Sequence, residues 1–133
     1  MDEYIRRKVY IDDGKHNKFR ELKGSDVHGD SVFSSMKDIF MVAAIMGYNS
    51  GEKREVKNGR DIFDKGVFNE HDLTLLYSIF LDYYQDVEAL ESTDVLGLIE
   101  EFANAGIDEL YELVNKQGEG IVNVVEEILV NYS

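Results

Sequence analysis

The sequence predicts an all-α fold, a compact bundle of four to five helices that forms one domain over residues 1–133. Apolar residues recur at spacings of three and four along several stretches, which is the pattern of helices with one buried face. The chain contains no proline, and short glycine-containing segments separate these stretches. Its 133 residues, 44% of them hydrophobic, are the size of one ordinary domain with a core.

The first 30 residues are polar and leave room for a short N-terminal strand, a small hairpin or a loosely ordered arm. Residues 4–11 fit a strand or an amphipathic turn equally well. A turn signal follows at residues 12–14. Residues 15–22 then fit a short helix that ends at Gly24.

Residues 36–46 are the clearest helix in the sequence. Ser35 is a suitable N-cap, and Asp38 stands three residues later, where a capping box places its acid. Past Asp38 the stretch is apolar on every face, so this helix is expected to be buried in the domain or pressed against a partner. Gly47 is expected to end it.

A connection over residues 48–66 precedes the second half of the chain. It is long for a structureless loop, so part of it is expected to fold as a small hairpin or lid. Asn69 and Asp72 then supply the two residues of a capping box. They predict a helix over residues 70–85.

Two further helices are expected toward the end of the chain. The first runs over residues 95–115, with Ser92 or Thr93 as its cap. Gly106 interrupts its apolar pattern, which indicates a kink or a close packing contact. A glycine-containing break follows, and residues 121–132 form the last amphipathic helix.

Charge is unevenly distributed along the chain, whose formal net charge is −13. Residues 1–68 carry 13 bases and 12 acids, whereas residues 69–133 carry one base, Lys116, and 15 acids. This asymmetry indicates either a face for a partner or an acidic surface that is simply solvated. The acidic field opposes binding of the whole chain to nucleic acid.

Several kinds of site are excluded or disfavoured by the residues present. The absence of cysteine excludes disulfides, thiolate metal sites and a cysteine nucleophile. His16, His28 and His71 lack the spacing of metal ligands, and no phosphate-binding glycine loop is found. We therefore expect no metal and no cofactor.

One acid-x-Lys pattern is typical of metal-dependent nucleases, which use it with an upstream acid to hold a divalent ion and orient water. Glu55 and Lys57 have this spacing, and Asp38 lies upstream. That chemistry needs the acid-x-Lys on a core strand, whereas residues 51–59 are polar and loop-like. A nuclease is therefore the least favoured interpretation.

The best candidate for an interaction patch consists of four bases in one short stretch: Lys53, Arg54, Lys57 and Arg60. Three interpretations stay open. The bases form a salt-bridged surface with Glu52 and Glu55, they make weak contacts with phosphate groups, or they contact a protein. No aromatic residues are interleaved with the bases, so stacking on nucleic-acid bases is not indicated.

Three segments are distinctive as an ordered series. They are residues 32–48 (VFSSMKDIFMVAAIMGY), 73–79 (LTLLYSI) and 99–107 (IEEFANAGI). The series is similar to the DNA phosphorothioation-associated protein 4 family, which is encoded beside the bacterial Dnd modification and restriction genes. The resemblance spans residues 32–114, roughly 60% of the chain, and leaves out the first 30 residues and the last helix.

The resemblance implies a setting in restriction and antiviral defence, and a role as a non-catalytic component, without supplying site residues. We therefore expect a non-enzymatic adaptor that binds a protein encoded in the same defence operon. Self-association through the helix over residues 36–46 is compatible with this role. The alternatives are a small DNA-binding module that uses the basic N-terminal half, with weak DNA contact, and the nuclease.

The sequence also predicts where the protein resides. No apolar run reaches the ~18 residues that a membrane span needs. The first four residues carry acid where a signal peptide carries base. We expect a cytoplasmic protein with no membrane contact.

Overall fold

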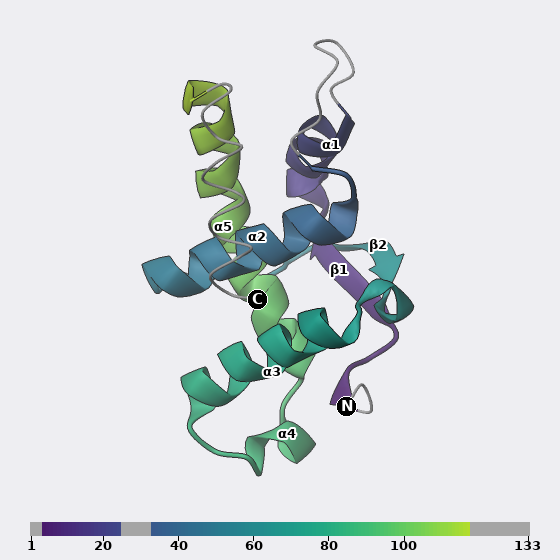
Figure 1. Cartoon of the computed structure of the whole chain (residues 1–133), viewed down its shortest axis with the longest axis vertical. Helices are drawn as coiled ribbons and strands as arrows, with labels where there is room; N and C mark the ends of the chain where they lie inside the picture. Colours follow the sequence, from purple (N-terminus) through teal and green to yellow (C-terminus); the bar gives the residue numbers. More distant parts are fainter. Residues whose placement is uncertain (1–3, 25–32, 118–133) are drawn as a thin grey trace.

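The computed structural model describes residues 4–24 and 33–117. In this part of the chain the fold is mostly helical, as predicted, and two long helices form its centre. They are α2 (Met36–Ser50) and α5 (Val95–Gln117), which cross each other (Figure 1). The predicted helix over residues 121–132 lies outside the described residues.

Smaller elements surround the two crossing helices. In Figure 1, α1 lies above α2, whereas α3 and α4 lie below it. Two 3₁₀ turns, η2 and η4, follow the two strands directly. The bounds of these elements are β1 (Lys8–Asp12), η2 (Asp13–Lys15), α1 (His16–Gly24), β2 (Gly59–Asp64), η4 (Lys65–Val67), α3 (Glu70–Tyr84) and α4 (Ala89–Ser92).

Two glycines allow α2 and α5 to touch through their backbones. A Cβ atom at Gly106 would lie 1.8 Å from the carbonyl oxygen of Ala43, and one at Gly47 would lie 2.0 Å from that of Phe102. Neither position has room for a side chain. The expected close packing at Gly106 is thereby confirmed.

The expectation that Gly47 ends its helix is wrong. α2 continues to Ser50, and Gly51 ends it in the left-handed conformation, with φ of 69°. The N–H group of Gly51 is directed at the carbonyl oxygens of Gly47 and Tyr48. Glycine is common both at the ends of helices and where two helices touch. At position 47 the close contact with α5, and not a helix end, requires glycine.

Some of the predicted helix caps form and others do not. Asn69 and Asp72 form the complete predicted capping box of α3. Ser35 caps α2 by accepting the N–H of Asp38 at 3.2 Å, but the Asp38 carboxylate accepts the Ser34 hydroxyl instead of completing the box. The carboxylate of Asp94, rather than Ser92 or Thr93, accepts the N–H of Gly97 in the first turn of α5.

The two strands that the sequence left open both form, and they pair with each other. β1 and β2 are antiparallel, with Lys8 opposite Asp64 and Asp12 opposite Gly59. The sheet therefore joins segments that α1 and α2 separate in the sequence. It is not a local hairpin within residues 48–66.

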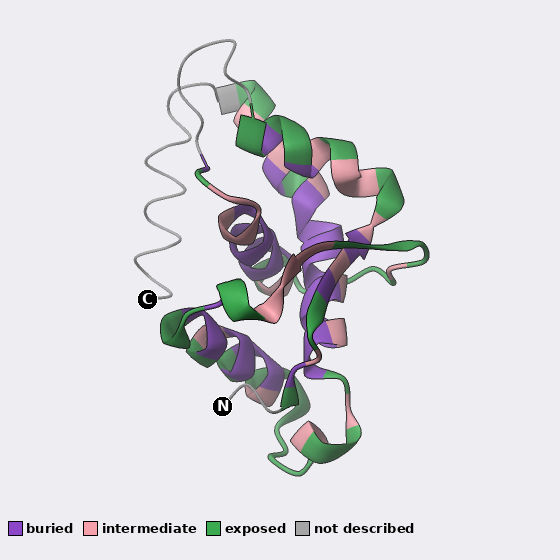
Figure 2. Ribbon diagram, turned by 90° about the vertical axis from the view of Figure 1, so that its right-hand side faces the viewer, coloured by how far each residue is buried: buried purple, intermediate pink, exposed green. Residues whose placement is uncertain are grey.

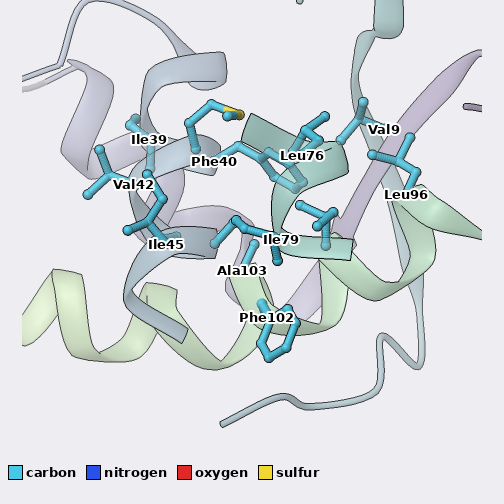
Figure 3. Packing of buried hydrophobic residues seen from close by; sticks show 14 of the residues in the cluster. Val9, Ile39, Phe40, Val42, Ile45, Leu76, Ile79, Leu96, Phe102 and Ala103 are labelled. Carbon is cyan, nitrogen blue, oxygen red and sulfur yellow. The ribbon is translucent and has the colours of Figure 1, made fainter. Parts of the chain in front are cut away.

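The core is continuous from the N-terminal strand to the last described helix. Figure 2 shows the buried residues gathered along the inner faces of the long helices. Figure 3 draws Val9, Phe40, Leu76 and Leu96 in this shared core, and all four are completely buried. Residues 4–24 also contribute to it, with five buried side chains: Ile5, Val9, Ile11, Phe19 and Leu22.

Candidate functional site

The segment that carries the predicted basic patch is fixed along α5. The N–H of Arg54 donates to the carbonyl oxygen of Glu101 at 3.0 Å. The side-chain Nδ2 of Asn104, which is 7% exposed, donates to the carbonyl oxygens of Arg54 and Glu55 at 3.2 and 3.1 Å. The side chain of Asn104 thus supplies the hydrogen bonds that a neighbouring strand would otherwise give to the backbone of this irregular segment.

The four bases of the predicted patch contact different partners. Lys53 lies 3.8 Å from Glu101 and 4.7 Å from the ring of Tyr83. Arg54 reaches Asp108, and Arg60 reaches Asp13, each at 3.2 Å. The backbone N–H of Lys57 donates to Asp12 at 3.4 Å. The described ion pairs of these bases are with acids of α5 and η2, and not with Glu52 or Glu55.

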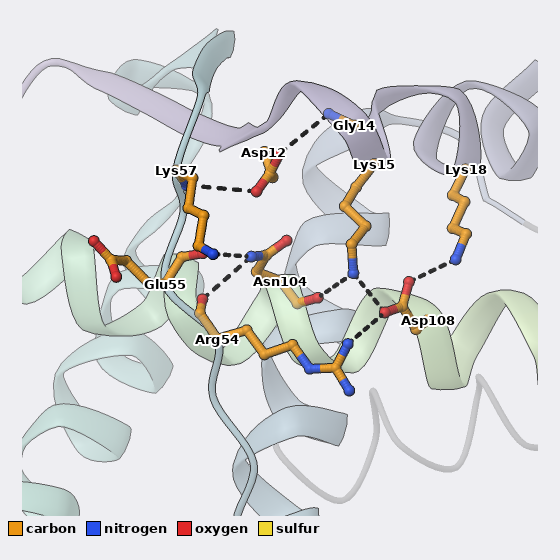
Figure 4. A network of polar contacts seen from close by, with 9 residues as sticks. All are labelled: Asp12, Gly14, Lys15, Lys18, Arg54, Glu55, Lys57, Asn104 and Asp108. Atoms are coloured by element: carbon orange, nitrogen blue, oxygen red, sulfur yellow. Dashed lines mark hydrogen bonds and ion pairs between the residues drawn. The ribbon is translucent and has the colours of Figure 1, made fainter.

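Asp108 in α5 is a shared acceptor for three bases (Figure 4). Lys18 and Arg54 contact its carboxylate at 2.6 and 3.2 Å, and Lys15 contacts it as well. Burial alone would raise the pKa of Asp108, but the hydrogen bonds from Lys15 and Lys18 outweigh it and lower the pKa. One carboxylate therefore joins η2, α1 and the segment after α2 to α5.

A second charged contact is more deeply buried. Glu100 in α5 is 4% exposed, and both of its carboxylate oxygens accept hydrogen bonds from the guanidinium of Arg6. The N–H of Tyr10 in β1 also donates to Glu100, at 2.6 Å. Burial raises the pKa of Glu100, and the contacts with Arg6 and Tyr10 offset part of that rise.

The sequence did not single out Lys15, Glu100 and Asp108 as interacting residues, and it offered Arg6 as a base for phosphate contact rather than as the partner of a buried acid. One signal was available for Glu100. It falls four residues after Leu96 and seven before Ile107, on the apolar face of its helix. A carboxylate on a buried face needs a basic partner, but the sequence does not say which of the many bases in the first half reaches it.

The acidic residues suggested for a nuclease, Asp38 and Glu55, do not come together. Asp38 accepts the Ser34 hydroxyl at 2.9 Å and lies 3.8 Å from the ammonium of Lys37. The side chain of Glu55 is exposed, and its segment is irregular rather than a strand. None of the contacts described for the chain joins Asp38 to Glu55 or Lys57, so the geometry that such a site needs is not formed there.

The two described histidines, His16 and His71, belong to different helices. His16 begins α1, and burial together with the charges of Arg60 and Arg20 lowers its pKa. His71 is exposed in the first turn of α3, and His28 lies outside the described residues. Within residues 4–24 and 33–117, no group of three or more metal-ligating side chains comes together.

A shallow hollow of about 930 Å³ lies beside the sheet. Two residues of the predicted patch, Lys57 and Arg60, line it together with Lys8. Asp13 and Asp61 line the same hollow, so its charge is mixed rather than strongly basic.

A comparison with protein families shows to which family the chain belongs. The sequence profile of the DNA sulphur modification system-associated protein 4 family matches residues 8–133. The chain belongs to this family. The match is wider than the segments over residues 32–114 indicated, because it includes β1, α1 and the end of the chain. Comparisons with curated proteins and with solved structures give no match.

The charge asymmetry of this family member has a structural role. Bases of the first half pair with acids of the second half along α5 and α3, as in Arg6 with Glu100 and Lys37 with Asp72. The uneven charge of the sequence is thus partly neutralised when the halves pack. None of the described helices is long and apolar enough to cross a membrane.

Proposed function

We propose that this protein is a non-catalytic accessory component of a DNA sulphur modification system and that it acts by binding another protein of that system. Membership of the family over residues 8–133 supports the setting. We extend that setting to the restriction of foreign DNA, in which an adaptor would hold a larger component in place.

The polar residues that could have served chemistry instead hold the fold together. This is the observation that carries the proposal. Asp108 joins three bases from separate elements, and Glu100 joins β1 and Arg6 to α5. Asn104 holds the segment with Glu55 through backbone contacts. Because these side chains stabilise the fold, they support a role in binding rather than in transforming a substrate.

A DNA-binding role is the second candidate, and the hollow beside the sheet favours it. Lys8, Lys57 and Arg60 line this hollow and could contact phosphates. Two carboxylates line it as well, and the net charge of the chain is −13. We therefore place the protein partner first.

Co-purification tests the proposal directly. The full chain, carrying an affinity tag, is co-expressed with the products of the neighbouring modification and restriction genes. We expect one of them to be recovered in a fixed ratio after washing at about 0.3 M salt, which removes weak ionic contacts. Recovery of the tagged chain alone from every combination would contradict the proposal.

A further inference from the structure

The end of α3 and the segment that follows it form a distinct surface at the end of the molecule opposite α1 (Figure 1). Gln85 ends α3 with a left-handed φ of 57°, and its N–H donates to the carbonyl oxygen of Leu81. The chain then turns into α4. A hollow of about 600 Å³ is lined there by Tyr4 and residues 86–92.

An apolar side chain is held outward on this surface. Val87 is 69% exposed, more than any other large hydrophobic residue in the described part of the chain. Its turn is fixed, because Asp86 accepts the N–H of Glu88 at 3.0 Å and the carbonyl oxygen of Val87 accepts the N–H of Leu90 at 3.1 Å. A preformed turn loses little conformational entropy when a partner binds it.

The acids on this surface differ from three acids of α5. Glu100, Glu101 and Asp108 each pair with a base from the first half of the chain. Asp86, Glu88 and Glu91 are exposed, and among the described residues none of them has an ion-pair partner. The hollow is therefore lined by three carboxylates without a described ion-pair partner, together with the apolar side chains of Val87 and Leu90.

We infer that this acidic–apolar surface, made of Tyr4, Asp86, Val87, Glu88, Leu90 and Glu91, docks a segment of a partner protein that carries lysine or arginine residues around one apolar side chain. The apolar side chain would pack beside Val87 in the hollow, and the basic residues would meet the three carboxylates at its rim. The inference rests on the proposed function, since it names the surface and the chemistry of the partner.

Charge complementarity decides the occupant. Three unpaired carboxylates attract a basic segment and repel the phosphates of nucleic acid. Protein interfaces commonly combine apolar side chains with polar ones at their edge, and tyrosine is enriched in them. Tyr4, 38% exposed, stands at the edge of the hollow with its ring near that of Tyr77.

A labelled peptide provides a defined probe. The probe is a fluorescent peptide of about 12 residues with one central leucine among lysines, and its binding to the full chain is followed by anisotropy as salt is raised. We expect Val87→Ser and Glu88→Lys each to weaken binding about tenfold. Both side chains are exposed, so neither change is expected to disturb folding.

Two matched variants serve as controls. Val67→Ser changes a valine that is 49% exposed in η4, outside the surface. Glu109→Lys makes the same charge change on an exposed residue of α5. Both should bind the peptide within about twofold of the wild type. Equal losses in Glu88→Lys and Glu109→Lys would show binding to net charge alone and would overturn the inference.

The same variants separate this inference from the proposed function. If co-purification yields a partner whose binding survives both Val87→Ser and Glu88→Lys, the protein is an adaptor but docks elsewhere, and the inference fails. If no partner is found while the peptide binds as expected, the surface stands and the proposed function fails. Sedimentation of the chain alone adds a third outcome. A dimer that Val87→Ser dissociates would make a second copy the occupant and overturn the inference.

Discussion

Gly106 in α5 lies against the carbonyl oxygen of Ala43 in α2, so closely that a Cβ atom there would be 1.8 Å from it. The obstacle is backbone rather than the end of a flexible side chain. It can be relieved only by moving one of the two central helices. Together with the contact of Gly47 with Phe102, it sets how near α2 and α5 approach.

Gly106→Ala should therefore be strongly destabilising, although alanine has the better helix propensity. We expect a loss of about 3 kcal/mol or more in the free energy of unfolding, at the upper end for overpacked cores. Urea denaturation monitored by circular dichroism measures it. Gly24→Ala is the matched control, because a Cβ atom there meets nothing within 4 Å. A cost below about 1 kcal/mol for Gly106→Ala would mean that the helices are not in backbone contact.

Arg6→Ala should destabilise the protein in a pH-dependent way. Loss of Arg6 leaves the buried carboxyl of Glu100 with the N–H of Tyr10, so its already raised pKa rises further. A carboxyl whose pKa is raised on folding binds its proton more tightly in the native state. The native state is therefore favoured at low pH, and this advantage is lost as the pH rises through the folded pKa.

The expected cost of Arg6→Ala is about 2 kcal/mol at about pH 8, and clearly less at about pH 5. This loss of stability is smaller than the loss expected for a fully buried ion pair, because the Arg6 side chain is 34% exposed. Urea unfolding at the two pH values measures it. Arg7→Ala is the control, since Arg7 is 81% exposed and pairs only with Asp64 among the described contacts. A cost that does not change with pH would contradict the role given to Glu100.

Asp108→Asn tests the shared acceptor. The pKa of Asp108 is lowered on folding, so its stabilising contribution is complete above the unfolded value of about 3.9 and is lost as the pH falls through the folded pKa. The variant should be less stable by about 1 kcal/mol at neutral pH, a value reduced for solvent screening. It should also lose less stability than the wild type on acidification. Thermal unfolding between about pH 2 and pH 7 shows both effects. Glu109→Gln, whose amide oxygen can still accept the Ser50 hydroxyl, is the control and should leave the stability at neutral pH within about 0.5 kcal/mol of the wild type.

The sequence predicted the helices because their evidence is local. Asn69 and Asp72 lie three residues apart, and the apolar stretch of α2 is uninterrupted, so both signals can be read from neighbouring residues. Gly47 was misread for the same reason. A glycine that ends a helix and one that permits helix contact look alike until the facing residue, Phe102, is known.

The site was less predictable because its contacts join distant positions. Arg6 and Glu100 are 94 residues apart, and Lys15 and Asp108 are 93 apart. Periodicity places Glu100 on the inward face, yet no local pattern chooses Arg6 among 13 bases in the first half. The partners of the predicted patch were hidden in the same way, because Arg54 pairs with Asp108 of α5 whereas Arg60 belongs to β2 and pairs with Asp13.

DNA binding by the basic residues should be weak and lost at physiological salt. Arg54 and Arg60 already face carboxylates, and a chain of net charge −13 repels a phosphate backbone. In a gel-shift series with a duplex of about 20 base pairs, we expect binding only well below about 0.15 M salt. The double variant Lys57→Ala with Arg60→Ala should abolish this weak binding at low salt. Lys116→Ala changes an exposed base far along α5 and should leave it unchanged. A shift by the wild type that persists at about 0.15 M salt would favour the DNA-binding role over the adaptor, because only several direct phosphate contacts could then outweigh the repulsion.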